Sequence, residues 1–303
     1  MRSGNRRKQF CRSAVFLMRF IFRKSAAMSG SWQNEGAERF LIVLGGDGTL
    51  NEAIQGMQHF EQVRLGYIPT GSSNDLARDL KIGHDIRPLM KKLLDGGTEH
   101  RMDLGCVTWN ADGKTQKRYF LVSCGIGYDA AVCQEALDSP MKDALNKLGL
   151  GKLTYLGIGL KQMLTLQHCR ASIRLDGREI IKAGKLLFAA GMIHRYEGGF
   201  CFCPKADDQD GLLDLCVVNN VPRWKFPIII PFALKGKHGG FKGVDQYRAS
   251  RIEIRTSTPC WVQTDGEIPG KLDRIELTVE KQKLRFIVQR FFYFYTFYTI
   301  VIR

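Results

Sequence analysis

One stretch, residues 41–52, limits the folds open to this chain more than any other part of the sequence. Four apolar residues, Leu41 to Leu44, run directly into Gly-Gly-Asp-Gly-Thr-Leu-Asn-Glu. The apolar run has no polar alternation, which is typical of a strand buried on both faces. The glycines allow a tight turn, and such a turn presents backbone N–H groups at the start of a helix. The stretch therefore predicts a strand, a phosphate-binding loop and a helix, in that order.

Asp47 is the unexpected residue of this loop. Its negative charge would repel a phosphate unless a divalent cation lies between the two groups. The loop is therefore a candidate metal–nucleotide site. A plain turn is the alternative, because Asp-Gly is a common turn dipeptide and the chain contains six of them.

The charge balance indicates an acidic partner. The 303 residues carry a net charge of +15, which favours nucleotides, nucleic acid or an anionic membrane surface. No motif with interleaved basic and aromatic residues occurs, so we predict no nucleic-acid partner. The nine cysteines form no Cys-x-x-Cys pair, as expected of reduced thiols in a cytosolic protein.

No apolar segment reaches the roughly 20 residues needed to span a bilayer. The aromatic segment Phe291–Ile302 is a dozen residues long. We expect a cytoplasmic protein, and peripheral contact with the inner face of the membrane stays open. The sequence does not indicate an oligomeric state.

The order of the predicted elements divides the chain in two. Strands over 39–44 and 63–68 alternate with helices over 51–59, 76–80 and 85–94, which predicts a parallel α/β sheet with its loops at one edge. Beyond residues 103–106, a hairpin, helices over 130–137 and 144–163 and several short strands indicate an antiparallel β-rich domain. We predict an α/β domain over 1–104 with residues 1–35 atypical, a β-rich domain over 105–290 and an apolar tail over 291–303.

Four further acidic residues follow loops or turns. Asp75 follows the turn at 69–74, Asp103 ends a strand, and Asp265 and Glu267 flank Gly266. Each has an ordinary explanation when taken singly. Asp75 suits the first turn of a helix, and Asp265-Gly266 suits a hairpin turn.

Taken together, these segments occur in an order that resembles a known family. The order is Gly-Gly-Asp-Gly-Thr-Leu-Asn-Glu at 45–52, Pro-Thr-Gly-Ser-Ser-Asn-Asp at 69–75, Asp103, Gly-Ile-Gly-Tyr-Asp-Ala at 125–130, Asp210-Gly-Leu-Leu-Asp at 210–214, and Asp-Gly-Glu at 265–267. It resembles the diacylglycerol kinase catalytic-domain family, specifically the soluble bacterial lipid kinases related to sphingosine kinases, over about residues 36–288. The glycine loop alone is shared with NAD kinases. The implied fold is a Rossmann-like α/β domain with a parallel sheet, of the NAD-kinase and diacylglycerol-kinase type, followed by an antiparallel β-sandwich that receives the lipid substrate.

The resemblance implies a role for each of these positions. The residues implied to bind the nucleotide and its metal are Gly45, Gly46, Asp47, Gly48, Thr49, Leu50, Asn51, Ser72, Asn74, Asp75 and Asp103. Within that set, Asp47, Asp75 and Asp103 would form an acidic network around a catalytic Mg²⁺. Asp265 or Glu267 would be the general base on the lipid hydroxyl. Asp210, with the backbone carbonyls of Asp207 and Leu212, would hold a second, structural Mg²⁺.

The implied function is an ATP- and Mg²⁺-dependent lipid kinase of phospholipid metabolism. It would transfer the γ-phosphoryl group to the hydroxyl of diacylglycerol or a related lipid alcohol at a membrane surface. Two alternatives stay open. One is a catalytically defective relative that binds nucleotide or lipid without turnover, because the family's Asn-Pro loop is missing from residues 1–35. The other is a small-molecule kinase of the NAD type.

Overall fold

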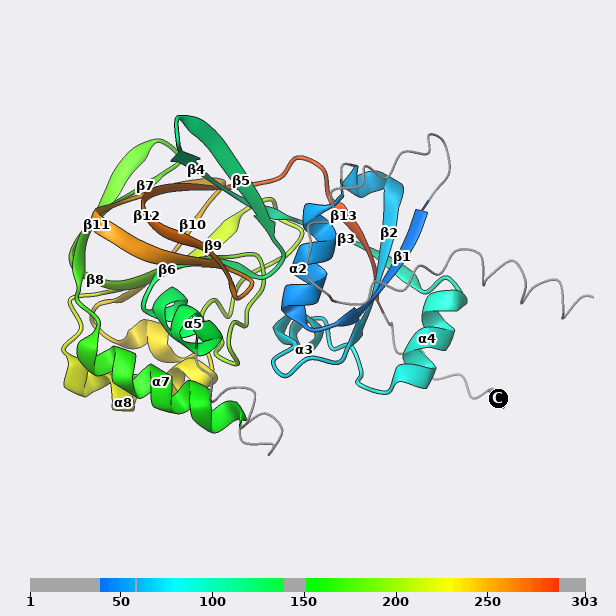
Figure 1. Cartoon of the computed structure of the whole chain (residues 1–303), viewed down its shortest axis with the longest axis horizontal. Helices are drawn as coiled ribbons and strands as arrows, with labels where there is room; N and C mark the ends of the chain where they lie inside the picture. The colour runs from blue at the N-terminus through cyan, green and yellow to red at the C-terminus, as the bar shows by residue number, and fades with distance from the viewer. Residues whose placement is uncertain (1–38, 58, 139–150, 289–303) are drawn as a thin grey trace, which may run out of the picture.

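The protein has two domains that lie side by side, each built on its own sheet (Figure 1). The computed structural model describes residues 39–57, 59–138 and 151–288. The atypical segment 1–35, the apolar tail 291–303 and the first part of the helix predicted over 144–163 lie outside the described residues. No helix of the described residues is long and apolar enough to cross a bilayer.

Among the described residues, the N-terminal sheet has four strands in the order β1-β2-β13-β3. Its strands are β1 (Arg39–Gly45), β2 (Val63–Pro69), β13 (Leu284–Val288) and β3 (Thr98–Met102). The β1–β2 and β2–β13 pairs are parallel, whereas β13 and β3 are antiparallel. The connecting helices are α2 (Asp47–Gln55), the 3₁₀ helix η1 (Phe60–Gln62), α3 (Asp75–Asp79) and α4 (Ile86–Leu94). The predicted α/β domain is confirmed, with a sheet that is parallel except at its β3 edge.

Two helix starts show how local chemistry sets these elements. Asp85 caps α4 as predicted, because its Oδ1 accepts a hydrogen bond from the Arg87 N–H at 3.2 Å. Helix α2 begins at Asp47, earlier than the predicted start at 51. The Leu50 N–H donates to the Gly46 carbonyl at 3.1 Å, so the Gly-Thr pair forms the first helical turn despite the low helix propensity of glycine.

Strand β13 corrects the predicted domain limits. Residues 284–288 were assigned to the β-rich domain over 105–290, yet they return to the first sheet between β2 and β3. Leu284 and Phe286 are fully buried there. A short apolar run predicts a strand but not the sheet it joins. The chain therefore crosses between the domains twice, once before β4 and once before β13.

The described part of the C-terminal domain forms a nine-stranded antiparallel sheet. Its strands are β4 (Gly105–Ala111), β5 (Lys114–Phe120), β6 (Ser123–Gly127), β7 (Cys169–Leu175), β8 (Arg178–Met192), β9 (Leu213–Asn219), β10 (Val244–Ala249), β11 (Arg251–Thr264) and β12 (Glu267–Val279). The order is β10-β9-β8-β6-β11-β12-β4-β5, and β7 also joins β11 to β8, so the sheet folds back over its own core. The predicted antiparallel sandwich is confirmed.

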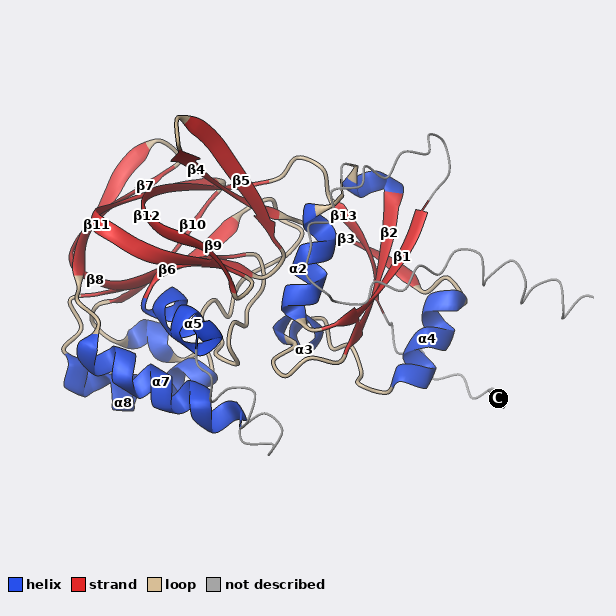
Figure 2. Ribbon diagram, in the orientation of Figure 1, coloured by secondary structure: helices blue, strands red, loops and turns tan. Residues whose placement is uncertain are grey.

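Helices cover the outer face of this sheet beneath β8 and β9 (Figure 2). They are α5 (Tyr128–Asp138), α7 (Gly151–Thr165) and α8 (Phe226–Leu234), with the short 3₁₀ helices η2 (Arg223–Lys225) and η3 (His238–Gly240) on either side of α8. Side chains alternate along β9: Val217 packs into the sandwich core, whereas Val218 packs against the helices. Met163 of α7 and Phe226 and Ile229 of α8 share that second cluster.

Candidate active site

The two predicted loops of the N-terminal domain meet at one edge of its sheet. Gly45 lies opposite Pro69 in the parallel β1–β2 register, and the Thr70 N–H donates to the Gly45 carbonyl at 2.8 Å. A Cβ atom added at Gly71 would lie 2.5 Å from the Gly46 Cα. Only glycine allows this approach, which explains why each loop carries one here. The carboxyl ends of parallel strands are the usual place for ligands in such sheets.

Asp47 is a buried carboxylate with one oxygen satisfied and one unpartnered. The backbone N–H of Asp75 donates to its Oδ2 at 2.8 Å, whereas its Oδ1 is buried without a hydrogen-bond partner among the described residues. Burial raises the pKa of Asp47 to about 6, and the charges of Asp75 and Asp265 add to that rise. Burial and the nearby Asp47 charge also raise the pKa of the Tyr67 phenol. A cation bound beside Asp47 would stabilise the charged form of its carboxylate.

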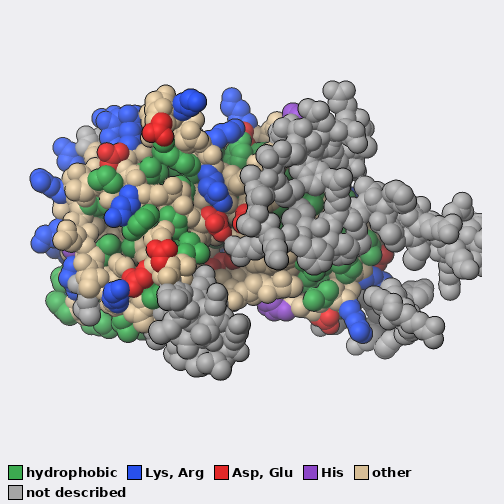
Figure 3. Space-filling model, viewed as in Figure 1, with side chains coloured by type: hydrophobic (Ala, Val, Ile, Leu, Met, Phe, Trp, Pro, Cys, Tyr) green, Lys and Arg blue, Asp and Glu red, His purple; other side chains and the backbone are tan. Residues whose placement is uncertain are grey.

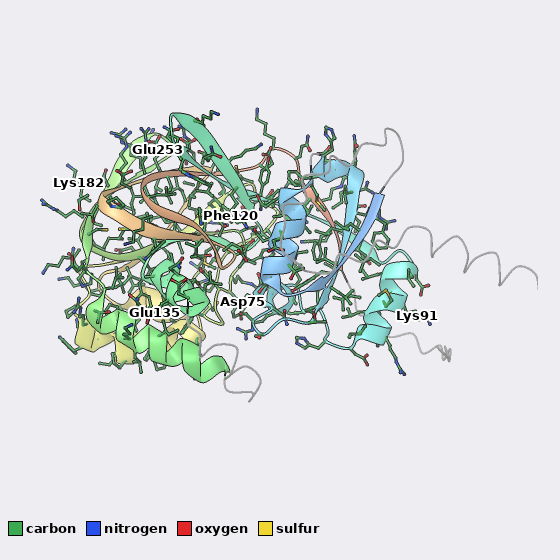
Figure 4. All side chains as sticks on the ribbon, in the orientation of Figure 1. Asp75, Lys91, Phe120, Glu135, Lys182 and Glu253 are labelled. Atoms are coloured by element: carbon green, nitrogen blue, oxygen red, sulfur yellow. The ribbon has the colours of Figure 1, made fainter. Side chains whose placement is uncertain are left out.

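Asp75 connects the two domains at the start of α3. Its Oδ2 accepts from the Ser73 hydroxyl at 2.7 Å, and its Oδ1 accepts from the Gly199 N–H of the C-terminal domain at 3.1 Å. Arg78 lies 3.6 Å from the same Oδ1. Figure 4 shows Asp75 on the side of the N-terminal domain that faces the other domain. Acidic side chains also gather along that junction in the space-filling view (Figure 3).

Asp265 occupies a tight hairpin turn and accepts four hydrogen bonds. With Gly266 it links β11 to β12, and both residues have positive φ, 49° and 86°, as in two-residue hairpin turns. Its carboxylate accepts from the Asn51 amide at 2.8 Å and from three consecutive backbone N–H groups, at 2.7 Å (Leu121), 2.9 Å (Val122) and 3.0 Å (Ser123). Burial nevertheless raises the pKa of Asp265. The Asp265-Gly266 pair therefore forms a hairpin turn and also lies at the candidate site, so the two interpretations do not exclude each other.

Glu267 lies against the glycine loop from the opposite domain. A Cβ atom added at Gly48 would come within 3.0 Å of the Glu267 Oε1. The β11–β12 hairpin thus carries two carboxylates to the junction, and they differ in their surroundings. Asp265 is surrounded by donors, whereas Glu267 faces the loop where phosphate is expected.

Of the residues predicted to hold the nucleotide, Leu50, Asn51 and Asn74 have side chains that make structural contacts, whereas Ser72 has no such role among the described residues. Leu50 is fully buried in the N-terminal core. The Asn51 amide donates to Asp265 and to the Tyr119 carbonyl, which fastens α2 to the C-terminal domain. Asn74 has a left-handed backbone (φ 52°), and its side chain bonds both the N–H and the carbonyl of Gly71. Ser72 is exposed at the loop edge.

A second acidic group at the junction was missed as a site from the sequence. Asp129 of α5 and Glu197 both interact with the Gln263 side chain, and the Asp129 contact is 3.3 Å. Asp129 Oδ1 and Glu197 Oε2 are buried without partners among the described residues. Burial raises the pKa of Asp129 to about 6 and, together with the Asp129 charge, raises that of Glu197. Asp129 belongs to the Gly-Ile-Gly-Tyr-Asp-Ala motif, but no sequence signal joins it to Glu197.

Asp103, predicted to form one acidic network with Asp47 and Asp75, makes its described contacts with Lys283, Gly211 and Asp208. Its Oδ1 pairs with the Lys283 Nζ at 2.9 Å, and its Oδ2 accepts from the Gly211 N–H at 2.8 Å. Its own N–H donates to the Asp208 carbonyl. Asp103 therefore belongs with the loop at 207–212, which it ties to the N-terminal domain.

In that loop the carboxylate of Asp210, predicted as a ligand of a second Mg²⁺, is already hydrogen-bonded through both oxygens. Arg248 donates to Asp210 Oδ2, and the Leu212 N–H donates to Asp210 Oδ1 at 2.9 Å. Asp207 Oδ1 accepts from the Gln209 N–H at 3.0 Å. Within the described ranges, no group of three His, Cys, Asp or Glu side chains is placed to hold a metal ion. A cation bound at Asp210 would have to displace the Arg248 guanidinium.

Comparison with known proteins agrees with this fold. Residues 23–107 match the diacylglycerol kinase catalytic domain, and residues 122–288 match the YegS C-terminal NAD kinase beta sandwich-like domain. The Bacillus subtilis protein named "Putative lipid kinase YtlR" is 30% identical over 232 residues, which cover 76% of this chain and 74% of the relative. "Diacylglycerol kinase" of Staphylococcus aureus strain Newman is 28% identical over 242 residues, covering 80% of this chain and 72% of the relative. A crystal structure described as a putative diacylglycerol kinase from Bacillus anthracis has a TM-score of 0.62 at 23% identity, covering 82% of this chain and 76% of that one.

These matches define a kinase that is built from an α/β domain and a β-sandwich domain. The chain belongs to the diacylglycerol kinase catalytic-domain family. The family match begins at residue 23, inside the segment predicted to be atypical.

Proposed function

We propose that this protein is an ATP- and Mg²⁺-dependent lipid kinase that phosphorylates the hydroxyl of diacylglycerol or a related lipid alcohol. The observation that carries the proposal is the unpartnered Asp47 Oδ1 in a glycine loop at the domain junction. A buried carboxylate in this setting favours a cation, and a helix start after glycines favours phosphate. The relatives named as lipid and diacylglycerol kinases support the choice of acceptor.

The N-terminal domain would hold the nucleotide. The backbone of residues 45–49 at the start of α2 and the exposed Ser72 hydroxyl would contact the phosphates. Asp47 and Asp75 have the hard oxygen donors that suit Mg²⁺, directly or through water. When bound, Mg²⁺ would supply the positive charge that stabilises the phosphoryl group during transfer.

The C-terminal domain would bring the lipid hydroxyl and the base to that phosphate. Glu267 faces the loop at Gly48, and its carboxylate would accept the hydroxyl proton. Asp265 can take a proton only by giving up one of its four donors, and its contacts orient the hairpin that carries Glu267. Asp129 and Glu197 add polar groups on the acceptor side of the junction.

The substrate would be taken from a membrane surface by a cytoplasmic protein.

A transfer assay tests the proposed function. The full chain is incubated with γ-labelled ATP, Mg²⁺ and mixed micelles that contain diacylglycerol, monoacylglycerol or a sphingoid alcohol, with NAD as a separate acceptor. We expect label in one of the lipids and none in NAD. Label in NAD alone would replace this proposal by an NAD-type kinase, and Mg–ATP binding without transfer to any acceptor would identify a non-catalytic relative.

A further inference from the structure

Helix α8 is apolar on every face, although one of its faces is exposed. Its sequence, Phe-Pro-Ile-Ile-Ile-Pro-Phe-Ala-Leu, contains no polar side chain. Phe226, Ile229 and Ala233 are buried, and the first two pack with residues of β8 and β9. The other side of the helix leaves Ile228, Phe232 and Leu234 exposed by 49, 44 and 50%. A surface helix of a globular protein ordinarily carries polar residues on that side.

The exposed apolar side chains concentrate at this place. Trp224, immediately before α8, is 68% exposed, the largest value among the large apolar side chains of the described residues. Of the nine such exposed side chains described, four lie within residues 224–234. The lower left edge of the space-filling view, where α7 and α8 lie, shows hydrophobic side chains at the surface (Figure 3). Such a concentration of exposed apolar side chains indicates a binding surface.

Basic residues flank the same helix, and acidic ones are missing from its segment. Residues 215–244 contain Arg223, Lys225, Lys235, Lys237 and Lys242 and no Asp or Glu. The Lys225 Nζ lies 5.4 Å from the centre of the Trp224 ring. Beside the start of α8, a groove is lined by Arg170, Lys185 and Arg223, again with no acidic residue in its lining. We call Trp224, Ile228, Phe232 and Leu234, with these flanking basic residues, the α8 surface.

We propose that the α8 surface docks the protein on an anionic lipid bilayer. The exposed apolar side chains and Trp224 would enter the interface between head groups and acyl chains, and the flanking Lys and Arg would contact anionic head groups. Charge complementarity selects this occupant. A second copy of the chain would bring two sets of basic residues together, which disfavours self-association through the same face.

The position of α8 also connects it to the junction site, and this connection rests on the proposed function. The Cys201 N–H donates to the Ala233 carbonyl in the last turn of α8 at 3.0 Å. Two residues earlier, the Gly199 N–H donates to Asp75. The segment between α8 and Asp75 is therefore short, so a docked α8 would hold the junction close to the bilayer that contains the lipid alcohol.

The test is co-sedimentation of the full chain with vesicles, without nucleotide. Vesicles of phosphatidylcholine alone are compared with vesicles of equal parts phosphatidylcholine and phosphatidylglycerol. We expect binding to the anionic vesicles that weakens with salt. Ile228→Asp should weaken it roughly tenfold or more, and Lys235→Gln about fivefold. Leu94→Asp is the matched control, because Leu94 is 49% exposed on α4 of the other domain, and it should bind as the wild type does.

A second readout uses Trp224 itself. Its fluorescence should shift to the blue on anionic vesicles, and Trp224→Phe should remove that shift. Unchanged binding by Ile228→Asp, or equal losses in Ile228→Asp and Leu94→Asp, would overturn the proposal. So would a dimer in sedimentation velocity that Ile228→Asp dissociates, since the surface would then be an interface between copies. Vesicle binding does not require turnover, so a failed kinase assay leaves this test intact.

Discussion

Two groups of acidic residues lie where the domains meet, and they differ in how their charge is balanced. In the junction group, Asp47, Asp129 and Glu197 each keep a buried oxygen without a described partner, and burial raises all three pKa values. In the loop group, Asp103 pairs with Lys283 and Asp210 with Arg248. An unbalanced buried charge costs stability and suits a bound cation, whereas a balanced one holds the fold. We therefore propose a catalytic role for the first group and a structural role for the second.

The largest expected effect is at Asp47. Asp47→Asn removes the unpartnered charge, and we expect it to lower kinase turnover by roughly 10³-fold, because phosphoryl transfer depends on charge neutralisation. The measurement is initial rate at saturating Mg–ATP. Glu52→Gln, on the exposed side of the same helix, is the control and should retain activity.

The same substitution should also stabilise the metal-free protein. Burial raises the folded-state pKa of Asp47 from 3.8 to about 6, so the wild type loses stability as pH rises from about 4 through 6. Asp47→Asn lacks that loss, and its unfolding free energy should exceed that of the wild type by on the order of 1–3 kcal/mol at pH 8. Urea unfolding at pH 4.5 and pH 8 measures the difference. If the unfolding free energies of both proteins depend equally on pH, the folded-state pKa of Asp47 is not raised.

Substitutions of Asp265 and Glu267 should differ in their effects on the unfolding free energy. Glu267→Gln is expected to lower turnover by roughly 10²–10⁴-fold, with a change in unfolding free energy below about 0.5 kcal/mol. Asp265→Asn should lower turnover as well and destabilise the fold by about 2–4 kcal/mol, because an amide NH₂ would face donors already bonded to Asp265. If Glu267→Gln keeps full activity, Asp265 is the base.

The loop group should affect stability more than catalysis. Lys283→Met leaves the Asp103 carboxylate, whose side chain is 1% exposed, without its cation. We expect the unfolding free energy to fall by about 2 kcal/mol, which is below the range for fully buried pairs because Lys283 is partly exposed. Turnover should fall by less than about tenfold. Lys281→Met, two positions away, should change neither. A turnover loss as large as that of Asp47→Asn would place Asp103 in the catalytic group after all.

The smallest effect concerns Mg²⁺ at Asp210. Mg²⁺ with a non-hydrolysable ATP analogue should raise the wild-type melting temperature, and EDTA should remove the rise. Because Arg248 already balances Asp210, Asp210→Asn should change the apparent Mg²⁺ affinity by less than about twofold. Loss of the Mg²⁺-dependent rise in Asp210→Asn would establish the second metal site that the sequence resemblance implies.

The sequence could predict local units but not their distant partners. The glycine loop at 45–49 and the turn at 69–75 are readable because apolar runs, glycines and helix caps act over a few residues. The partners of the site residues lie far along the chain: Asn51 and Asp265 are 214 positions apart, and Asp103 lies opposite Lys283. The pairing of Asp129 with Glu197, the return of β13 to the first sheet and the exposure of α8 all depend on tertiary packing.

The most direct test of the central claim is to locate the cation. Crystals grown with Mn²⁺ and a non-hydrolysable ATP analogue would be measured at the manganese absorption edge. The account predicts an anomalous peak beside Asp47, bonded to a carboxylate oxygen at about 2.1 Å or joined to it by one water. A manganese peak at Asp210 with none near Asp47 would contradict it.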